Sequence, residues 1–269
     1  MSRRPPVSGY FRSGLPFNRL GHGPRPLVVV QGLLFENKPQ PRFALGPYAF
    51  LGERYTVFVV LRRPGMPRGY TLQEMASDCA ATIREEFGGP VDVIGVSTGG
   101  SIVQHLAADH PDVVRRLVIH SSAYTLSPSA RRLQLRVAEL AGERRWTEAS
   151  ALLVDAVVPR RGIPAPARPL IVWPVSRLMS WFSRPAGPTD LIVTIEAEDV
   201  HDFRDRLREI TAPALIIAGA EDPFYTEALF RETAAGIPGA RLVLYPGMGH
   251  PAHGKRFAHD VLAFLTAAT

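Results

Sequence analysis

A serine flanked by glycines at a two-residue spacing is the clearest chemical signal in this chain. Ser97 lies in the run Gly95-Val96-Ser97-Thr98-Gly99, directly after the largely apolar residues 91–94. A sharp turn from a strand into a helix forces such a serine to positive φ and crowds its neighbours two residues away, so only very small side chains fit there. The turn also aims the first N–H groups of the helix at the atom that the hydroxyl attacks. The spacing therefore predicts that Ser97 is a nucleophile with part of an anion site beside it.

The pentapeptide alone is weak evidence for a nucleophile, because a match of this kind arises by chance in about one chain in ten of this length. The residues on either side of it strengthen the prediction. An apolar β-type run precedes the motif, and apolar residues at helical spacing follow it: Ile102, Val103, Leu106 and Ala107. His110-Pro111 ends the helical pattern. Strand, turn and helix in this order are the context that the motif requires.

A base and an acid for this serine are available downstream. A serine hydroxyl needs a base to take its proton, and histidine serves best when a carboxylate holds its tautomer. Asp222 and His250 each follow an apolar, strand-like run, and the order Ser, Asp, His is that of one serine-hydrolase architecture. We predict Ser97, Asp222 and His250 as a catalytic triad, with Glu221 and His253 as the rival acid and base.

Oxyanion donors are expected next to the nucleophile. Gly32 lets the backbone approach closely, so the Leu33 N–H is one predicted donor, and the Thr98 N–H is the other. The candidates for a substrate pocket are apolar or follow a strand: Leu34, Phe35, His120, Trp173 and Met179. The apolar residues of the segment 170–182 could equally pack that segment on the core or touch a membrane or micelle.

Apolar strands alternating with helical patterns predict a mostly parallel sheet with helices on both faces. After a loose start up to about residue 13, strands are expected at residues 15–20, 27–30, 55–61, 91–96, 117–120, 213–219 and 241–245. Between residues 125 and 202 helix-like segments replace strands, and the Pro-rich run 159–169 interrupts them. We therefore expect residues 1–124 and 203–269 to form the core and residues 125–202 to form a helical insertion over the site, where such sheets bind ligands.

The composition is that of one ordinary globular domain, with 269 residues, 46% of them hydrophobic and 21% charged. The formal charge of +6 comes mainly from arginines scattered as pairs, without the basic tract and aromatics of a nucleic-acid surface. Cys79 is the single cysteine, and the N-terminus does not resemble a secretory signal. We expect a cytoplasmic protein without a nucleic-acid partner or stable membrane insertion.

The chain resembles the α/β-hydrolase fold superfamily with a helical cap, through Gln31-Gly32, the run Gly95 to Gly100, residues 202–222 and Gly249-His250. The resemblance implies an eight-stranded sheet and a serine hydrolase that needs no cofactor. Gln31 is a departure, since many members place histidine there. A serine at position 97 argues against the dehalogenase and epoxide hydrolase branches, whose nucleophile is aspartate.

The leading hypothesis is hydrolysis of a hydrophobic carboxylic ester through an acyl-enzyme. Hydrolysis of a C–C bond, lactone or thioester, and perhydrolysis of the haloperoxidase type, use the same triad and remain alternatives. A further alternative is a protein that keeps the fold and binds a ligand without catalysing a reaction. The sequence shows neither clustered Cys/His spacing nor a Gly-rich phosphate loop, so no metal or cofactor is expected. The expected partner is a small hydrophobic ester or acyl substrate, and the sequence leaves open whether two copies of the chain form a homodimer.

Overall fold

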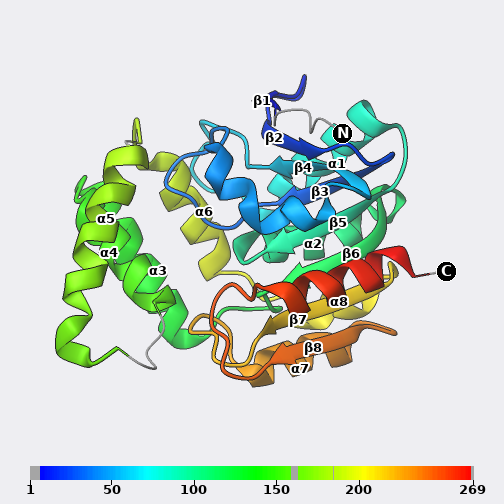
Figure 1. Ribbon diagram of the computed structural model, residues 1–269. Helices are drawn as coiled ribbons and strands as arrows, with labels where there is room; N and C mark the ends of the chain where they lie inside the picture. Colours follow the sequence, from blue (N-terminus) through cyan, green and yellow to red (C-terminus); the bar gives the residue numbers. More distant parts are fainter. Residues whose placement is uncertain (1–6, 159–162, 184, 268–269) are drawn as a thin grey trace.

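A single twisted sheet organises the molecule (Figure 1). The computed structural model describes residues 7–158, 163–183 and 185–267. Within these residues eight strands pair in the order β1-β2-β4-β3-β5-β6-β7-β8. The strands are β1 (Val7–Tyr10), β2 (Pro16–Gly21), β3 (Arg25–Val30), β4 (Tyr55–Val60), β5 (Val91–Val96), β6 (Val114–His120), β7 (Ala214–Gly219) and β8 (Arg241–Tyr245). The pairs β1–β2 and β2–β4 are antiparallel and the other pairs are parallel, which confirms the predicted mostly parallel sheet of eight strands.

The central strands are buried on both faces, as continuous apolar runs predict. Every residue of β5 and of β7 is buried. One face packs against α1 (Leu72–Phe87), α2 (Thr98–Asp109) and α7 (Glu227–Gly236). The other face packs against the 3-10 segment η1 (Arg42–Leu51) and α8 (Lys255–Thr266), which crosses the front of the sheet in Figure 1. Two apolar cores therefore hold the sheet between them.

Four helices separate β6 from β7 in the chain, although these two strands are neighbours in the sheet. The helices are α3 (Pro128–Gly142), α4 (Trp146–Val157), α5 (Pro169–Ser183) and α6 (Thr189–Asp199), and we call them the helical insertion. The helices α3, α4 and α6 share an apolar cluster with Phe35, which lies in the loop after β3. Figure 1 shows the insertion beside the sheet, with α5 on its outer side.

Two elements differ from the expectations drawn from the sequence. The start of the chain was expected to be loose, but Val7–Tyr10 pair with β2 as an edge strand. The segment η1 was not predicted, because Gly46 and Pro47 interrupt its apolar pattern. Shorter 3-10 turns lie at η2 (Pro111–Val113), η3 (Ala165–Ala167) and η4 (Arg204–Glu209).

Candidate active site

Ser97 lies on a sharp turn between β5 and α2, with φ 53° and ψ −125°. The glycines around it are required by close packing. A Cβ on Gly95 would lie 2.5 Å from the Gly99 carbonyl oxygen, and a Cβ on Gly99 would lie 2.1 Å from the Val30 carbonyl oxygen. The strained backbone and small neighbours are those expected from the sequence, and they leave the serine at the carboxyl end of the sheet.

Asp222 and His250 meet at the same end of the sheet, after β7 and β8. His250 Nδ1 lies 2.7 Å from Asp222 Oδ2, and the Asp222 side chain is fully buried. The other carboxylate oxygen of Asp222 accepts hydrogen bonds from the backbone N–H groups of Phe224 at 2.8 Å and Tyr225 at 3.2 Å. Because a carboxylate at this distance accepts the Nδ1 proton, the second ring nitrogen of His250 can act as a base.

The end of β6 holds the loop that carries His250. His120 Nε2 lies 2.7 Å from the Ala252 carbonyl oxygen, and the Ala252 N–H donates to Ser121 Oγ at 2.9 Å. Burial lowers the pKa of His120 to about 3, so its ring is neutral at physiological pH. Since a carbonyl oxygen can only accept, the proton resides on Nε2. His120 therefore fixes the backbone two residues beyond His250.

Two backbone N–H groups beside Ser97 have no hydrogen-bond acceptor within the described part of the chain: those of Leu33 and Thr98. Gly32 brings the first of them close, since a Cβ on Gly32 would lie 3.2 Å from Ser97 Cβ. Arg62 holds this loop from behind, donating from Nη1 to the Gln31 carbonyl oxygen and from Nη2 to that of Gly32, both at 3.0 Å. The two predicted donors are thus available to an anion at Ser97.

A buried carboxylate lies under the turn that carries Ser97, called the nucleophile turn after the role predicted for Ser97. Glu198, near the end of α6, is fully buried and accepts hydrogen bonds from the hydroxyls of Thr98, Ser101 and Tyr225, the last two at 3.0 and 3.1 Å. Burial raises the pKa of Glu198, and these hydrogen bonds and the nearby Arg62 oppose that rise. The carboxylate therefore joins the first turn of α2 to Tyr225, whose N–H contacts Asp222.

A cavity of about 560 Å³ opens in front of Ser97 and His250. The loop after β3 supplies Leu33, Leu34 and Phe35 on one side, and the helical insertion supplies the other side with Gln134, Leu153, Val154, Val157 and Leu178. Among the described residues no hydrogen bond joins Ser97 to His250, but both line this cavity. Hydrogen bonds between catalytic groups often tighten only when a substrate binds.

The predicted pocket residues are not all brought together. Leu34 and Phe35 line the main cavity, whereas Trp173 is not among the described residues around it and is 49% exposed on α5. His120 lies instead against a second cavity of about 310 Å³. The side chain of Met179 lies outside the described residues, so its predicted place in the pocket stays a prediction.

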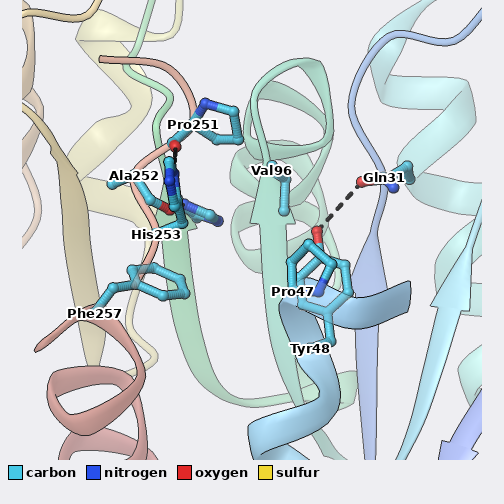
Figure 2. A pocket seen from close by; sticks show the side chains of 9 residues that line it. Gln31, Pro47, Tyr48, Val96, Pro251, Ala252, His253 and Phe257 are labelled. Atoms are coloured by element: carbon cyan, nitrogen blue, oxygen red, sulfur yellow. Dashed lines mark hydrogen bonds between the residues drawn. The ribbon is translucent and has the colours of Figure 1, made fainter. Parts of the chain in front are cut away.

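The second cavity lies between η1 and the loop that leads into α8, as Figure 2 shows. Tyr48 donates its hydroxyl to Gln31 Oε1 at 3.3 Å on one side, and Phe257 packs against the His120 ring on the other, with ring centroids 4.4 Å apart. Gln31, Val96 and Pro251 line both cavities. Because these three residues are the chain neighbours of Gly32, Ser97 and His250, the second cavity adjoins the candidate site.

No group of three or more His, Cys, Asp or Glu that could hold a metal ion is found among the described residues. The chemistry that the described side chains support is that of a serine, a histidine paired with a carboxylate, and backbone donors. The fold and this arrangement are those of an α/β hydrolase.

Comparison with known proteins agrees with this class. The sequence profile of the alpha/beta hydrolase family matches residues 15–262, and the chain belongs to that family. A Klebsiella pneumoniae protein named as a carbamate hydrolase, RutD, is 28% identical over 195 residues, which cover 69% of this chain and 68% of that protein. A pimeloyl (acyl-carrier protein) methyl ester esterase from Neisseria meningitidis is 25% identical over 190 residues, which cover 69% of this chain and 72% of the esterase. The resemblance inferred from the sequence motifs is thereby confirmed.

Solved structures share the whole architecture. The enol-lactonase from Burkholderia xenovorans LB400 superposes with a TM-score of 0.72 at 25% identity and covers 97% of this chain and 100% of its own. A hydrolase from Pseudomonas aeruginosa PA01 superposes with a TM-score of 0.76 at 24% identity, covering 97% and 98% of the two chains. The second likeness shows a shared fold.

Two residues that the sequence reasoning missed lie directly behind the site, Arg62 and Glu198. Arg62 belongs to one of several arginine pairs, and Glu198 lies in an acidic helical end, so both have the sequence signature of ordinary surface residues. Their burial comes from contacts about 30 and 100 residues away along the chain. No local pattern signals such contacts.

Proposed function

We propose that this protein is a serine hydrolase that cleaves a hydrophobic carboxylic ester through an acyl-enzyme. The observation that carries the proposal is the 2.7 Å distance between His250 Nδ1 and the buried carboxylate of Asp222. The same histidine lines the main cavity together with Ser97. The likeness to a methyl ester esterase supports the same reaction class. The predicted roles of the three residues form the first part of the proposal.

The reaction follows from the positions of these groups. Ser97 Oγ attacks the ester carbonyl carbon while His250 takes the hydroxyl proton, and Asp222 holds the His250 tautomer. The N–H groups of Leu33 and Thr98 bind the oxyanion. Its collapse breaks the bond to the alcohol oxygen, which leaves with the proton from His250. Water then gives a proton to His250 and attacks the acyl carbon, and Ser97 regains its proton as the acid leaves.

The shape of the main cavity supports an apolar acyl group as the substrate. Its volume of about 560 Å³ lies in the range of small-molecule sites, and its walls carry leucine, valine and phenylalanine side chains. The walls come partly from the core and partly from the insertion, so we propose that the insertion acts as a cap that selects the acyl chain. An unbranched or aromatic acyl group suits these walls better than a charged one.

Lactone hydrolysis is the second candidate, favoured by the likeness to an enol-lactonase across almost the whole chain. The same groups perform it, but the alcohol stays attached to the acyl chain after the ring opens. Carbamate cleavage is suggested in the same way by the relative from Klebsiella pneumoniae. A substrate panel separates these options, because the triad chemistry is common to them.

A fluorophosphonate probe tests the proposed nucleophile. The probe is expected to label the peptide that contains Ser97 in the parent and to leave Ser97→Ala and His250→Ala unlabelled. His253→Ala is the matched control, since His253 lies three residues beyond His250 and is exposed. For the acid, Asp222→Asn is compared with Glu221→Gln. We expect kcat to fall by at least about 10³-fold in the triad variants and to change little in the two controls.

The substrate class is tested with p-nitrophenyl esters of increasing acyl length, simple lactones and aryl carbamates. The ester proposal predicts the highest kcat/KM for esters with apolar acyl chains. A higher kcat/KM for lactones or carbamates would keep the protein among the hydrolases but replace the ester as its proposed substrate. A folded parent that neither reacts with the probe nor hydrolyses any of these compounds would contradict the proposal and favour a binding protein, which ligand-induced stabilisation of Ser97→Ala would then detect.

A further inference from the structure

The outer face of α5 exposes large apolar side chains to solvent. Among the described residues, more of them are exposed in α5 than in any other element: Leu170, Ile171, Trp173, Val175, Leu178 and Trp181. Leu170 is 77% exposed. Scattered apolar residues are normal on a protein surface, but a contiguous apolar face of this kind marks a binding surface.

The described residues on the inner face of the same helix are one valine and two serines. Val172 and Ser176 are buried, and Ser180 is half-buried against α4. Ser176 donates its hydroxyl to the Val172 carbonyl oxygen at 2.6 Å, and the Ser180 hydroxyl lies 3.1 Å from that of Thr147 in α4. A surface helix of a water-soluble protein directs most of its large apolar residues inward, whereas among the described residues of α5 only Val172 is placed so.

This reversed pattern matches a helix that faces lipid. Helices in lipid contact one another through small residues such as serine and direct large apolar residues outward. Tryptophan is enriched where a helix meets the interfacial region of a bilayer, and α5 has two, Trp173 and Trp181. The pattern therefore favours lipid over a protein partner.

Charge and length determine how such a helix would meet a membrane. The segment Pro169–Ser183 contains no acidic residue, and its single charged side chain is the exposed Arg177. No helix in the described ranges is long and apolar enough to cross a membrane. A helix with these properties lies in the plane of the interface, and its cationic side chain is attracted to anionic headgroups.

We propose that the outer face of α5 docks this protein on the surface of a phospholipid bilayer that carries anionic headgroups. The placement of α5 allows this, since the helix packs mainly against α4 and lies on the side of the insertion away from the sheet (Figure 1). Leu178 is 55% exposed and also lines the main cavity. Docking therefore places one wall of that cavity at the lipid surface, where apolar substrates concentrate; only this last step rests on the proposed function.

Tryptophan fluorescence and vesicle flotation test the docking directly, without any assay of hydrolysis. Trp146 packs against Phe35 within the insertion, so Trp173 and Trp181 are the tryptophans that would enter the interface. We expect the parent to float with vesicles of phosphatidylcholine and phosphatidylglycerol and to show a blue-shifted emission. In Leu170→Ser/Trp173→Ser we expect binding at least about tenfold weaker. Tyr10→Ser is the control, because Tyr10 is 57% exposed on the distant strand β1.

Several outcomes overturn the proposal. A parent that stays free of both mixed and pure phosphatidylcholine vesicles contradicts it. Equal weakening in the Tyr10 control also contradicts it, because binding would then not be confined to α5. Self-association that the α5 variant abolishes, without vesicle binding, would assign the face to a second copy of the chain. Circular dichroism and the melting temperature of each variant show whether it is folded. If a variant is unfolded, the blue shift of the unaltered parent on adding vesicles still tests the proposal.

Discussion

Arg62 Nη2 donates a 3.0 Å hydrogen bond to the carbonyl oxygen of Gly32, although only 3% of the arginine is exposed. Burial lowers the pKa of Arg62 to about 10, and the nearby Glu198 opposes that change, so the guanidinium stays charged at neutral pH. Its second terminal nitrogen holds the carbonyl oxygen of Gln31. A buried cation thus fixes the loop that presents the Leu33 N–H.

Replacing Arg62 with lysine is expected to lower kcat by about 10- to 100-fold with little change in KM. The planar fork of arginine bonds both carbonyl groups at once, whereas an ammonium group cannot reproduce that geometry, and a misplaced oxyanion donor acts on the transition state. Steady-state kinetics with a soluble ester measure the effect. Arg63→Lys is the matched control, because Arg63 is exposed and pairs with Asp78. Equal losses in both variants would contradict a positioning role for Arg62.

Removing the Glu198 carboxylate is expected to destabilise the fold and the nucleophile turn together. Glu198→Ala leaves three buried hydroxyl donors without their acceptor, and we expect a loss of about 3 kcal/mol in the free energy of unfolding. Glu198→Gln keeps one amide oxygen as an acceptor and should lose less. Urea unfolding monitored by circular dichroism gives both values. An alanine variant as stable as the parent would show that these hydrogen bonds contribute nothing net.

The same carboxylate gives a pH dependence of known sign. Burial raises the pKa of Glu198, so the folded state binds this proton more tightly than the unfolded chain does. Its contribution is therefore greatest below pH of about 4.5 and is lost as the pH rises through the folded-state pKa. We expect the stability of the parent relative to Glu198→Gln to fall over that range. A difference that rises with pH would contradict this sign.

Two buried histidines should make the protein sensitive to acid. Burial lowers the pKa values of His120 and His201 to about 3, below the ordinary 6.5. Both are neutral in the fold and gain protons on unfolding, so stability is present above pH of about 6.5 and falls by about 2 kcal/mol per residue as the pH drops from 7 to 5. Unfolding free energies at these pH values should show a smaller loss in His201→Phe than in the parent. His259→Gln, at an exposed position, should behave like the parent.

Adding one methyl group at Gly99 is expected to destabilise the protein severely. A Cβ there would lie 2.1 Å from the backbone oxygen of Val30, so the strand or the turn must shift. Such overpacking usually costs about 1–3 kcal/mol and more against rigid backbone. Gly89→Ala is the control, because a Cβ at Gly89 would meet nothing within 4 Å. Thermal unfolding of the two variants compares them; similar melting temperatures would argue against the packing explanation.

Much of the sheet and the candidate triad could be predicted from the sequence because their signals are local. Apolar runs indicated the buried strands, and the spacing of Gly95, Ser97 and Gly99 indicated the turn. β1 escaped prediction because an exposed four-residue edge strand has no apolar pattern. Arg62 and Glu198 escaped it because their partners are distant in sequence. The supporting groups of the site depend on tertiary packing, which no short window of sequence contains.

The helices of the insertion differ in how they are attached to the rest of the molecule. Glu198 makes α6 part of the support of the nucleophile turn, whereas α5 is attached mainly through α4. We therefore expect substitutions to be tolerated better in α5 than in α6. A chimera that takes α5 from a relative and keeps Thr189–Asp199 should retain the geometry around Ser97. If the insertion selects the acyl chain as proposed, α5 is an exchangeable part of that selection and α6 is its fixed point of attachment.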